Sequence, residues 1–193
     1  MEDNGTLKWR FDVSTFRLIG RDLITDRVTA LFELVKNCYD ANATEVTVKF
    51  DNVGLDKQNS AITISDDGFG MSFADIRDKW MVIGTSNKRS NPYTPLPFHR
   101  KCVGEKGIGR FAVDKLGDKV NIITKQEGEN DWLNVEIDWE SYYNNSNNQQ
   151  LSLFTDIENH YEFYPAEDKT EHGTMLNIKN IREVWEEEDI QRL

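Results

Sequence analysis

The fold prediction rests on an expected helix at residues 25–41, which read TDRVTALFELVKNCYDA. Apolar side chains recur along it at the spacing of a core-facing stripe, namely Val28, Leu31, Phe32, Val35 and Tyr39. At about 100° per residue, Glu33, Asn37 and Asp40 share an arc of roughly 60° on the opposite side. A polar face of this kind is ordinarily solvated, so the helix alone does not indicate a binding site.

Composition predicts one packed domain and limits the partners that it could bind. The chain has 193 residues, of which 38% are hydrophobic and 11% aromatic, enough for a single core. A net charge of −11 argues against direct nucleic-acid binding by this domain. Basic side chains nevertheless concentrate between positions 88 and 110, which suits a small polyanion: Lys88, Arg89, Arg100, Lys101, Lys106 and Arg110.

The two cysteines and three histidines form neither a disulfide framework nor a metal-ligand pattern. Cys38 adjoins the apolar stripe and is expected to be a small buried hydrophobe. The acidic, polar N-terminus does not resemble a signal peptide, and no apolar run has the length of a membrane span. We therefore expect a reducing, cytoplasmic setting without a membrane partner.

Local patterns predict a single α+β domain with two layers over residues 1–193. Strands are expected at 45–50, 61–65, 119–124, 132–139 and 173–178, and further helices at 72–80 and 109–115. An N-terminal extension over 1–24 holds a candidate edge strand, Trp9 to Val13. A closing helix within 180–193, capped by Asn180, is expected to lead to a further domain. Residues 84–104 hold three of the four prolines, which is typical of a functional lid or of disorder.

The segment Asp66-Asp67-Gly68-Phe69-Gly70-Met71 ends the second expected strand with carboxylates and two glycines. The glycines allow a tight turn and a close approach of the backbone to a planar ligand. A carboxylate only accepts hydrogen bonds, so Asp66 suits an exocyclic amine such as that of adenine. An ordinary Asp-Gly turn is the alternative, and Phe73 excludes a dinucleotide-binding G-x-G-x-x-G.

A second glycine-rich stretch leads into the helix expected at 109–115 and reads Val103-Gly104-Glu105-Lys106-Gly107-Ile108-Gly109-Arg110-Phe111. Closely spaced glycines before a helix expose backbone N–H groups that bind phosphate, and Lys106 and Arg110 add positive charge. A Walker A loop is absent, and a flexible linker is the alternative. A late pair, Gly173-Thr174, says little alone, since threonine is a common strand residue.

Together and in this order, the four motifs resemble those of the GHKL superfamily, which includes gyrase B, the ninety-kilodalton heat-shock chaperones, histidine kinases and MutL. Residues 33–41 look like its N box, Glu-x-x-x-Asn-x-x-Asp-Ala. Residues 66–70, 104–109 and 173–174 match its Asp-x-Gly-x-Gly box, glycine-rich box and late Gly-Thr pair. The resemblance implies a two-layer α/β sandwich of the Bergerat type, with a mixed, largely antiparallel sheet, helices on one face and an ATP lid at 84–104.

The same resemblance implies ATP or ADP and Mg²⁺ as ligands, and it carries roles to matching residues. Asn37 would be the metal ligand, Asp66 would accept the adenine amine, and Thr174 would assist at the adenine. Further nucleotide contacts are implied along the four motifs and at the start of the lid: Asp40, Ala41, Gly68, Gly70, Met71, Thr85, Ser86, Gly104, Lys106, Gly107, Ile108, Gly109, Arg110 and Phe111.

Glu33 decides between hydrolysis and binding alone. In the hydrolase branches of this superfamily a glutamate at this position activates the attacking water, and Asp40-Ala41 favours the chaperone, topoisomerase and MutL side. The resemblance thus implies ATP-dependent lid closure and homodimerisation in a larger protein with downstream domains. The alternatives are a histidine-kinase-type or non-hydrolysing nucleotide-sensing domain, and a structural module whose glycine motifs are incidental.

Overall fold

The structure is a computed structural model that describes residues 22–54, 56–82, 92–104, 109–144 and 157–193. Its described strands are β1 (Val46–Asp51), β2 (Ala61–Asp66), β3 (Gly117–Lys125), β4 (Asp131–Asp138), β5 (His160–Pro165) and β6 (Gly173–Ile181). They form one sheet in the order β1-β2-β6-β3-β4-β5. Every neighbouring pair in this order is antiparallel, so the sheet is antiparallel throughout.

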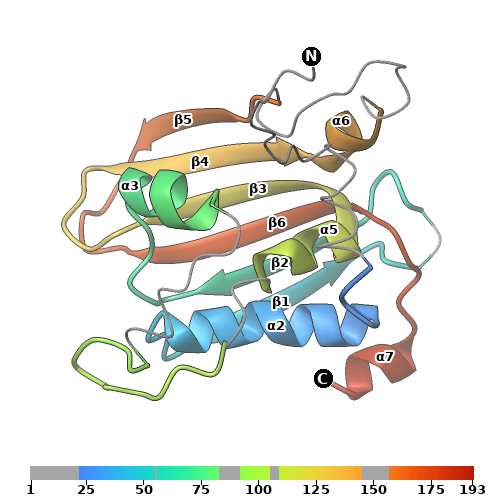
Figure 1. Ribbon diagram of the computed structural model, residues 1–193, viewed down its shortest axis with the longest axis horizontal. Coiled ribbons are helices and arrows are strands. Elements are labelled where there is room, and N and C mark those ends of the chain that lie inside the picture. The colour runs from blue at the N-terminus through green and yellow to red at the C-terminus, as the bar shows by residue number, and fades with distance from the viewer. Residues whose placement is uncertain (1–21, 55, 83–91, 105–108, 145–156) are drawn as a thin grey trace, which may run out of the picture.

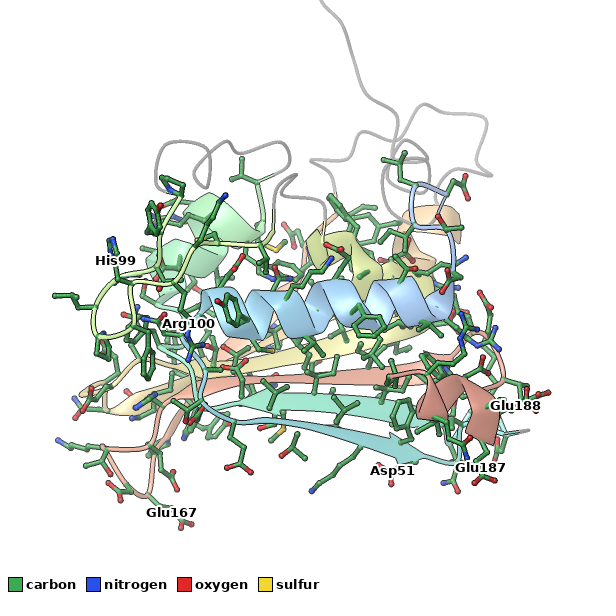
Figure 2. The ribbon with its side chains drawn as sticks, turned by 90° about the horizontal axis from the view of Figure 1, so that it is seen from below. Asp51, His99, Arg100, Glu167, Glu187 and Glu188 are labelled. Atoms are coloured by element: carbon green, nitrogen blue, oxygen red, sulfur yellow. The ribbon has the colours of Figure 1, made fainter. Side chains whose placement is uncertain are left out.

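The helices are α2 (Arg27–Asp40), α3 (Phe73–Asp75), α5 (Ala112–Leu116), α6 (Trp139–Asn144) and α7 (Glu187–Gln191). A π-helical turn, Ile76–Trp80, continues α3, and a 3₁₀ turn, Gly109–Phe111, precedes α5. Helices α2, α3 and α5 cover one face of the sheet, as Figure 1 and Figure 2 show from two directions. The predicted two-layer α+β sandwich is therefore confirmed, whereas the described strands contain no parallel pair and do not form the mixed sheet that was expected.

The core lies between this helical layer and the sheet. Alternate residues of the central strands point into it, among them Ile64 on β2, Ile122 on β3 and Ile178 on β6, each at most 1% exposed. Leu31 and Leu34 of α2 meet them from the other layer and are equally buried. This burial of apolar surface fixes α2 across the sheet, because each buried leucine or isoleucine contributes about 1.5–3 kcal/mol.

Helix α2 forms where it was predicted, but the predicted stripe is partly wrong. Phe32 and Tyr39 are 40% and 41% exposed, whereas Leu34 is buried, and Cys38 is buried as predicted. Apolar side chains occur on more than one side of this helix, so periodicity alone could not select the buried side. Contact with α5 and the sheet selects the side that carries these residues: Val28, Ala30, Leu31, Leu34 and Cys38.

The C-terminal segment also differs from the prediction. Strand β6 continues to Ile181, Asn180 has a positive φ of 55°, and α7 spans only Glu187–Gln191, so the closing helix from Asn180 is wrong. Residues 182–186, between β6 and α7, form neither helix nor strand, and Trp185 packs there against Phe50 with ring centroids 5.2 Å apart. Strand β5 and helix α6 were not predicted.

Helix α3 begins as its sequence predicts. Ser72 and Asp75 form a capping box, in which each side chain accepts a hydrogen bond from the other residue's backbone N–H. None of the helices formed by the described residues is long and apolar enough to cross a membrane. The candidate strand Trp9 to Val13 lies outside the described residues.

Candidate functional site

A cavity of about 1110 Å³ lies beside α2 and reaches from Glu33 to Thr174. It is bounded by α2, the C-terminal end of β2, the start of β6 and the segment 93–104. Many of the predicted site residues line it together: Glu33, Asn37, Asp40, Ala41, Asp66, Gly70, Met71, Gly104, Gly109 and Thr174. The polar arc of α2 is therefore one wall of a cavity, and the solvated-face interpretation does not hold.

One end of the cavity brings Glu33 and Asn37 against the glycine-rich segment. A Cβ atom placed on Gly109 would lie 3.4 Å from Asn37 Nδ2 and 3.6 Å from Glu33 Oε2. The other carboxylate oxygen of Glu33, Oε1, pairs with Lys36 Nζ at 2.6 Å. A carboxylate, an amide and the backbone of a glycine-rich segment thus meet at this end.

Another part of the cavity wall is formed by Asp66, the last residue of β2. Asp66 Oδ1 accepts a hydrogen bond of 2.9 Å from Gly68 N–H, and the antiparallel register places Asp66 opposite Thr174. The hydroxyls of Thr174 and the buried Thr124 lie 3.0 Å apart. Carboxylate and hydroxyl groups are therefore available here to recognise a polar edge of a ligand.

The surroundings of Asp66 disfavour the charged form of its carboxyl group. Burial raises the pKa of the Asp66 carboxyl, while the hydrogen bond from Gly68 N–H opposes this rise and the neighbouring Asp67 adds to it. Burial and the charge of Asp66 also raise the pKa of the Cys38 thiol, which donates to Leu34 O at 3.4 Å. Among the described residues no cationic side chain forms an ion pair with this half-buried carboxylate, and a carboxylate in such a setting is typical of a functional site.

The turn that follows Asp66 has a geometry that only glycine can adopt. Gly70 has a φ of +66°, and a Cβ atom there would lie 2.0 Å from Lys125 O. A Cβ atom on Gly68 would lie 2.7 Å from Ala41 O, so this residue packs directly against the end of α2. Met71 N–H donates to Thr124 Oγ1 at 2.8 Å and anchors the turn on β3.

Asp67 has a different role from Asp66. Its carboxylate accepts hydrogen bonds from Thr44 N–H at 2.7 Å and Glu45 N–H at 2.8 Å, and from the Thr44 hydroxyl. Burial raises the pKa of Asp67, but these hydrogen bonds outweigh it and hold the pKa below its ordinary value. Asp67 therefore fixes the start of β1, and only Asp66 faces the cavity.

The segment 92–104, the described part of the predicted lid, is attached to the C-terminal end of α2. Asp40 accepts hydrogen bonds from Val103 N–H at 2.9 Å and Gly104 N–H at 3.1 Å. Arg100 donates to Ala43 O at 2.7 Å, and its guanidinium lies over the Tyr39 ring (Figure 2). These contacts explain why Tyr39 is not in the core.

Not every predicted residue faces the cavity. Phe111 is 2% exposed and packs in the core, and Gly68 is buried beneath the turn, so only their backbones could contact a ligand. The structure describes the backbone of Arg110 but not its side chain. The remaining predicted contacts lie outside the described residues: Thr85, Ser86, Lys106, Gly107 and Ile108.

Three residues at the site were not predicted. Lys36 could have been found, because it lies three positions after Glu33 and this spacing places both on one helix face. Thr124 and His172 have no local signal, since they reach the Asp66 turn only through the pairing of distant strands. His172 Nδ1 lies 2.8 Å from Gly68 O.

The described residues hold no group of three or more His, Cys, Asp or Glu side chains that could bind a metal ion by themselves. Asn37 is the polar side chain beside Glu33 and Gly109 that could offer one oxygen ligand. This donor set fits Mg²⁺, which usually keeps several waters and takes few protein ligands together with phosphate oxygens from a substrate. The cavity thus holds the Asp66 carboxylate beside Thr174, and the Glu33 carboxylate and the Asn37 amide beside Gly109.

Comparison with known proteins agrees with this geometry. The family model described as "Histidine kinase-, DNA gyrase B-, and HSP90-like ATPase" matches residues 25–174. The chaperone protein HtpG of Sulfurovum sp. (strain NBC37-1) is 27% identical over 180 residues, which cover 84% of this chain and 26% of HtpG. The "Putative type II restriction enzyme HgiDII" of Herpetosiphon aurantiacus is 29% identical over 128 residues, or 66% of this chain and 19% of HgiDII.

A solved structure, the N-terminal domain of a DNA repair protein, has the same fold. Its TM-score is 0.53 at 19% sequence identity, and the match covers 86% of this chain and 39% of that chain. The present chain spans about a quarter or less of the length of the two relatives named above. They are therefore informative about this domain and not about the whole of either protein.

Proposed function

Because this chain belongs to the histidine kinase-, DNA gyrase B- and HSP90-like ATPase family, we propose that it binds ATP with Mg²⁺ and hydrolyses it. The observation that supports this proposal most is the shared cavity of Asp66, Asn37 and Glu33. A carboxylate acceptor for adenine, an oxygen ligand for the metal and a carboxylate that can act as general base line this one cavity.

Asp66 would recognise the adenine base. Gly68 N–H occupies one position on Oδ1. Since each carboxylate oxygen has two lone pairs, acceptor capacity remains for an amine. Thr174, whose hydroxyl is held by Thr124, would contribute a second polar contact at the same end.

The phosphates would lie at the other end, near Asn37 and Gly109. When bound, Mg²⁺ would neutralise negative charge on the phosphate oxygens. Asn37 would hold the ion through its side-chain oxygen, and the backbone N–H groups of the glycine-rich segment would bind phosphate oxygens. Lys106 and Arg110 would add positive charge, as their place in the sequence predicts.

Glu33 would act as the general base. Its Oε2 faces Gly109, where the terminal phosphate is expected, and its Oε1 is held by Lys36 at 2.6 Å. One water between Oε2 and the phosphate could give its proton to this oxygen as it attacks. Lys36 would restrict the carboxylate to one orientation.

We further infer that the domain serves a larger protein, as the similarity to HtpG over a quarter of the chaperone's length suggests. The segment 84–104 would close over bound nucleotide, two such domains would associate, and downstream domains would use the change. The anchoring of 92–104 on α2 by Asp40 and Arg100 supports a lid whose downstream end stays fixed.

The proposal is tested by phosphate release from the wild type and from Glu33→Ala. A general base contributes about 10²- to 10⁴-fold, so the variant should release phosphate at least about 100 times more slowly. ATP affinity, measured by calorimetry, should change little. Glu45→Gln is the matched control, because Glu45 is exposed at the start of β1 and is not among the residues that line the cavity.

Three outcomes separate the alternatives. Equal release rates for the wild type and Glu33→Ala would remove Glu33 as the base. ATP binding by the wild type without any hydrolysis would favour a nucleotide-sensing or kinase-type domain. Failure to bind ATP with Mg²⁺ at all would contradict the proposed function itself.

A further inference from the structure

A residue that does not line the cavity forms a hydrogen bond with the turn after Asp66. His172 Nδ1 lies 2.8 Å from Gly68 O. A carbonyl oxygen can only accept, so Nδ1 carries the proton and donates this hydrogen bond. His172 immediately precedes the Gly173-Thr174 pair, so the bond joins the start of β6 to the turn that ends β2.

The same glycine links His172 to Asp66. Gly68 receives the hydrogen bond on its carbonyl oxygen and donates one of 2.9 Å from its N–H to Asp66 Oδ1. Gly68 has no room to shift toward α2, because even a Cβ atom there would lie 2.7 Å from Ala41 O. The peptide between Gly68 and Phe69 is therefore held on two sides, because Phe69 N–H donates to Ala41 O at 2.9 Å and His172 donates to Gly68 O. The His172 bond is the one that joins this peptide to β6, and through Gly68 it helps to orient the Asp66 carboxylate.

The loop that carries His172 is itself fixed by a buried cation. Lys125 is only 1% exposed, and its Nζ donates to Lys169 O at 2.9 Å and to Glu171 O. Hydrogen bonds from a charged donor are stronger than neutral ones, so this contact holds the backbone just before His172. The backbone carbonyl oxygen of Lys125 also lies next to Gly70.

We propose that His172 is a positioning residue for base recognition: it orients Gly68 and thereby points the Asp66 carboxylate at the exocyclic amine of adenine. This inference rests on the proposed function, since it assumes that Asp66 contacts the base. It predicts a selective effect. Loss of the His172 hydrogen bond should weaken binding of nucleotides that carry the amine more than of nucleotides that lack it.

The test compares three variants, His172→Ala, His172→Gln and His172→Asn, by calorimetry with ATP and with purine riboside triphosphate, which lacks the amine. The asparagine amide nitrogen can take the place of Nδ1, whereas the longer glutamine side chain places its nitrogen nearer to Nε2. Loss of one such hydrogen bond should lower the affinity ratio of ATP to the analogue about fivefold in the alanine and glutamine variants. The asparagine variant should keep the wild-type ratio.

A purely structural role would lower the affinity for both nucleotides equally, or lower only the melting temperature, and either result would overturn the inference. If the alanine variant does not fold, the comparison of His172→Asn with His172→Gln still decides, because both keep a polar side chain. Equal ratios in these two variants would refute the role of Nδ1. If the wild type itself binds no ATP, it is the proposed function that fails.

Discussion

Replacing Asp66 by asparagine should weaken ATP binding and at the same time stabilise the free protein. The two side chains have nearly the same shape, but the carboxylate only accepts hydrogen bonds whereas the amide has one accepting and one donating end. Gly68 N–H already donates to Oδ1 at 2.9 Å. An asparagine at this position keeps that contact by placing its oxygen there, so its NH₂ group faces the ligand.

The size of the affinity loss follows from this exchange. A hydrogen bond to a charged acceptor is worth about 1.5–3 kcal/mol, and a donor now faces the adenine amine, which is also a donor. ATP affinity should therefore fall about 10- to 150-fold. Inosine triphosphate has a carbonyl in place of the amine, so Asp66→Asn should bind it better than the wild type does. Calorimetric titration with both nucleotides gives the two affinities directly.

The adjacent carboxylate provides the control. Asp67→Asn changes the same functional group one residue later, but Asp67 bonds to Thr44 and Glu45 and does not line the cavity. Its ATP affinity should remain within about twofold of the wild type, which is the size of an ordinary surface effect. Equal losses of affinity in the two variants, or an unchanged ATP affinity in Asp66→Asn, would refute the assignment of Asp66 to the base.

Stability should change with opposite signs in these two variants. Burial raises the folded-state pKa of Asp66, so the folded protein holds more protons than the unfolded chain between the ordinary and the raised value. The contribution of Asp66 to the free energy of unfolding therefore falls as the pH rises from the ordinary to the raised pKa. The asparagine side chain carries no charge, so Asp66→Asn should melt at a higher temperature than the wild type at neutral pH but not at acid pH. The pKa of Asp67 is lowered, so its contribution is present above its ordinary pKa and is lost on acidification. Asp67→Asn should accordingly melt below the wild type at neutral pH.

Two further predictions concern the turn and the lid. Gly70→Ala places a Cβ atom 2.0 Å from Lys125 O at a φ of +66°, so chemical denaturation should show a loss of about 3 kcal/mol or more in the free energy of unfolding. Gly128→Ala is the control, because Gly128 has a φ of +83° but no atom within 4 Å of the added Cβ, and it should lose about 1–2 kcal/mol. Equal costs would show that the close contact does not matter. Arg100→Ala removes the hydrogen bond of 2.7 Å to Ala43 O and the cation–π contact with Tyr39. The backbone amides of 92–104 should then exchange hydrogen about 5- to 30-fold faster. Unchanged exchange rates would contradict the anchoring role of Arg100.

The elements with strong local patterns were predictable. Helix α2 has a long apolar period and a capping residue, Asp26, whose carboxylate accepts a hydrogen bond from Thr29 N–H. Strand β2 alternates strictly and stops at the Asp66 turn. In each case the signal lies within a few residues of the element, and the sequence contains it in full.

The features that were not predicted depend on distant residues. The sequence of α2 allows more than one buried side, and the packing of α5, the sheet and Arg100 leaves Phe32 and Tyr39 outside the core. The sheet places β6, the last strand, between β2 and β3, so Thr124 and His172 reach the Asp66 turn from far along the chain. No local pattern marks either residue, because their partners are chosen by strand order.

Asp40 illustrates how the structure refines a role that resemblance alone assigns. Both of its carboxylate oxygens accept backbone hydrogen bonds, from Val103 and from Gly104. An acceptor of this kind repels phosphate oxygens, so its effect on the nucleotide is expected to be indirect, through the segment that precedes the glycine box. Helix α2 would then carry a base, a metal ligand and a lid anchor at positions i, i+4 and i+7, namely Glu33, Asn37 and Asp40. Because all three residues lie on one helix, a displacement of segment 92–104 that moved α2 would also move Glu33 and Asn37.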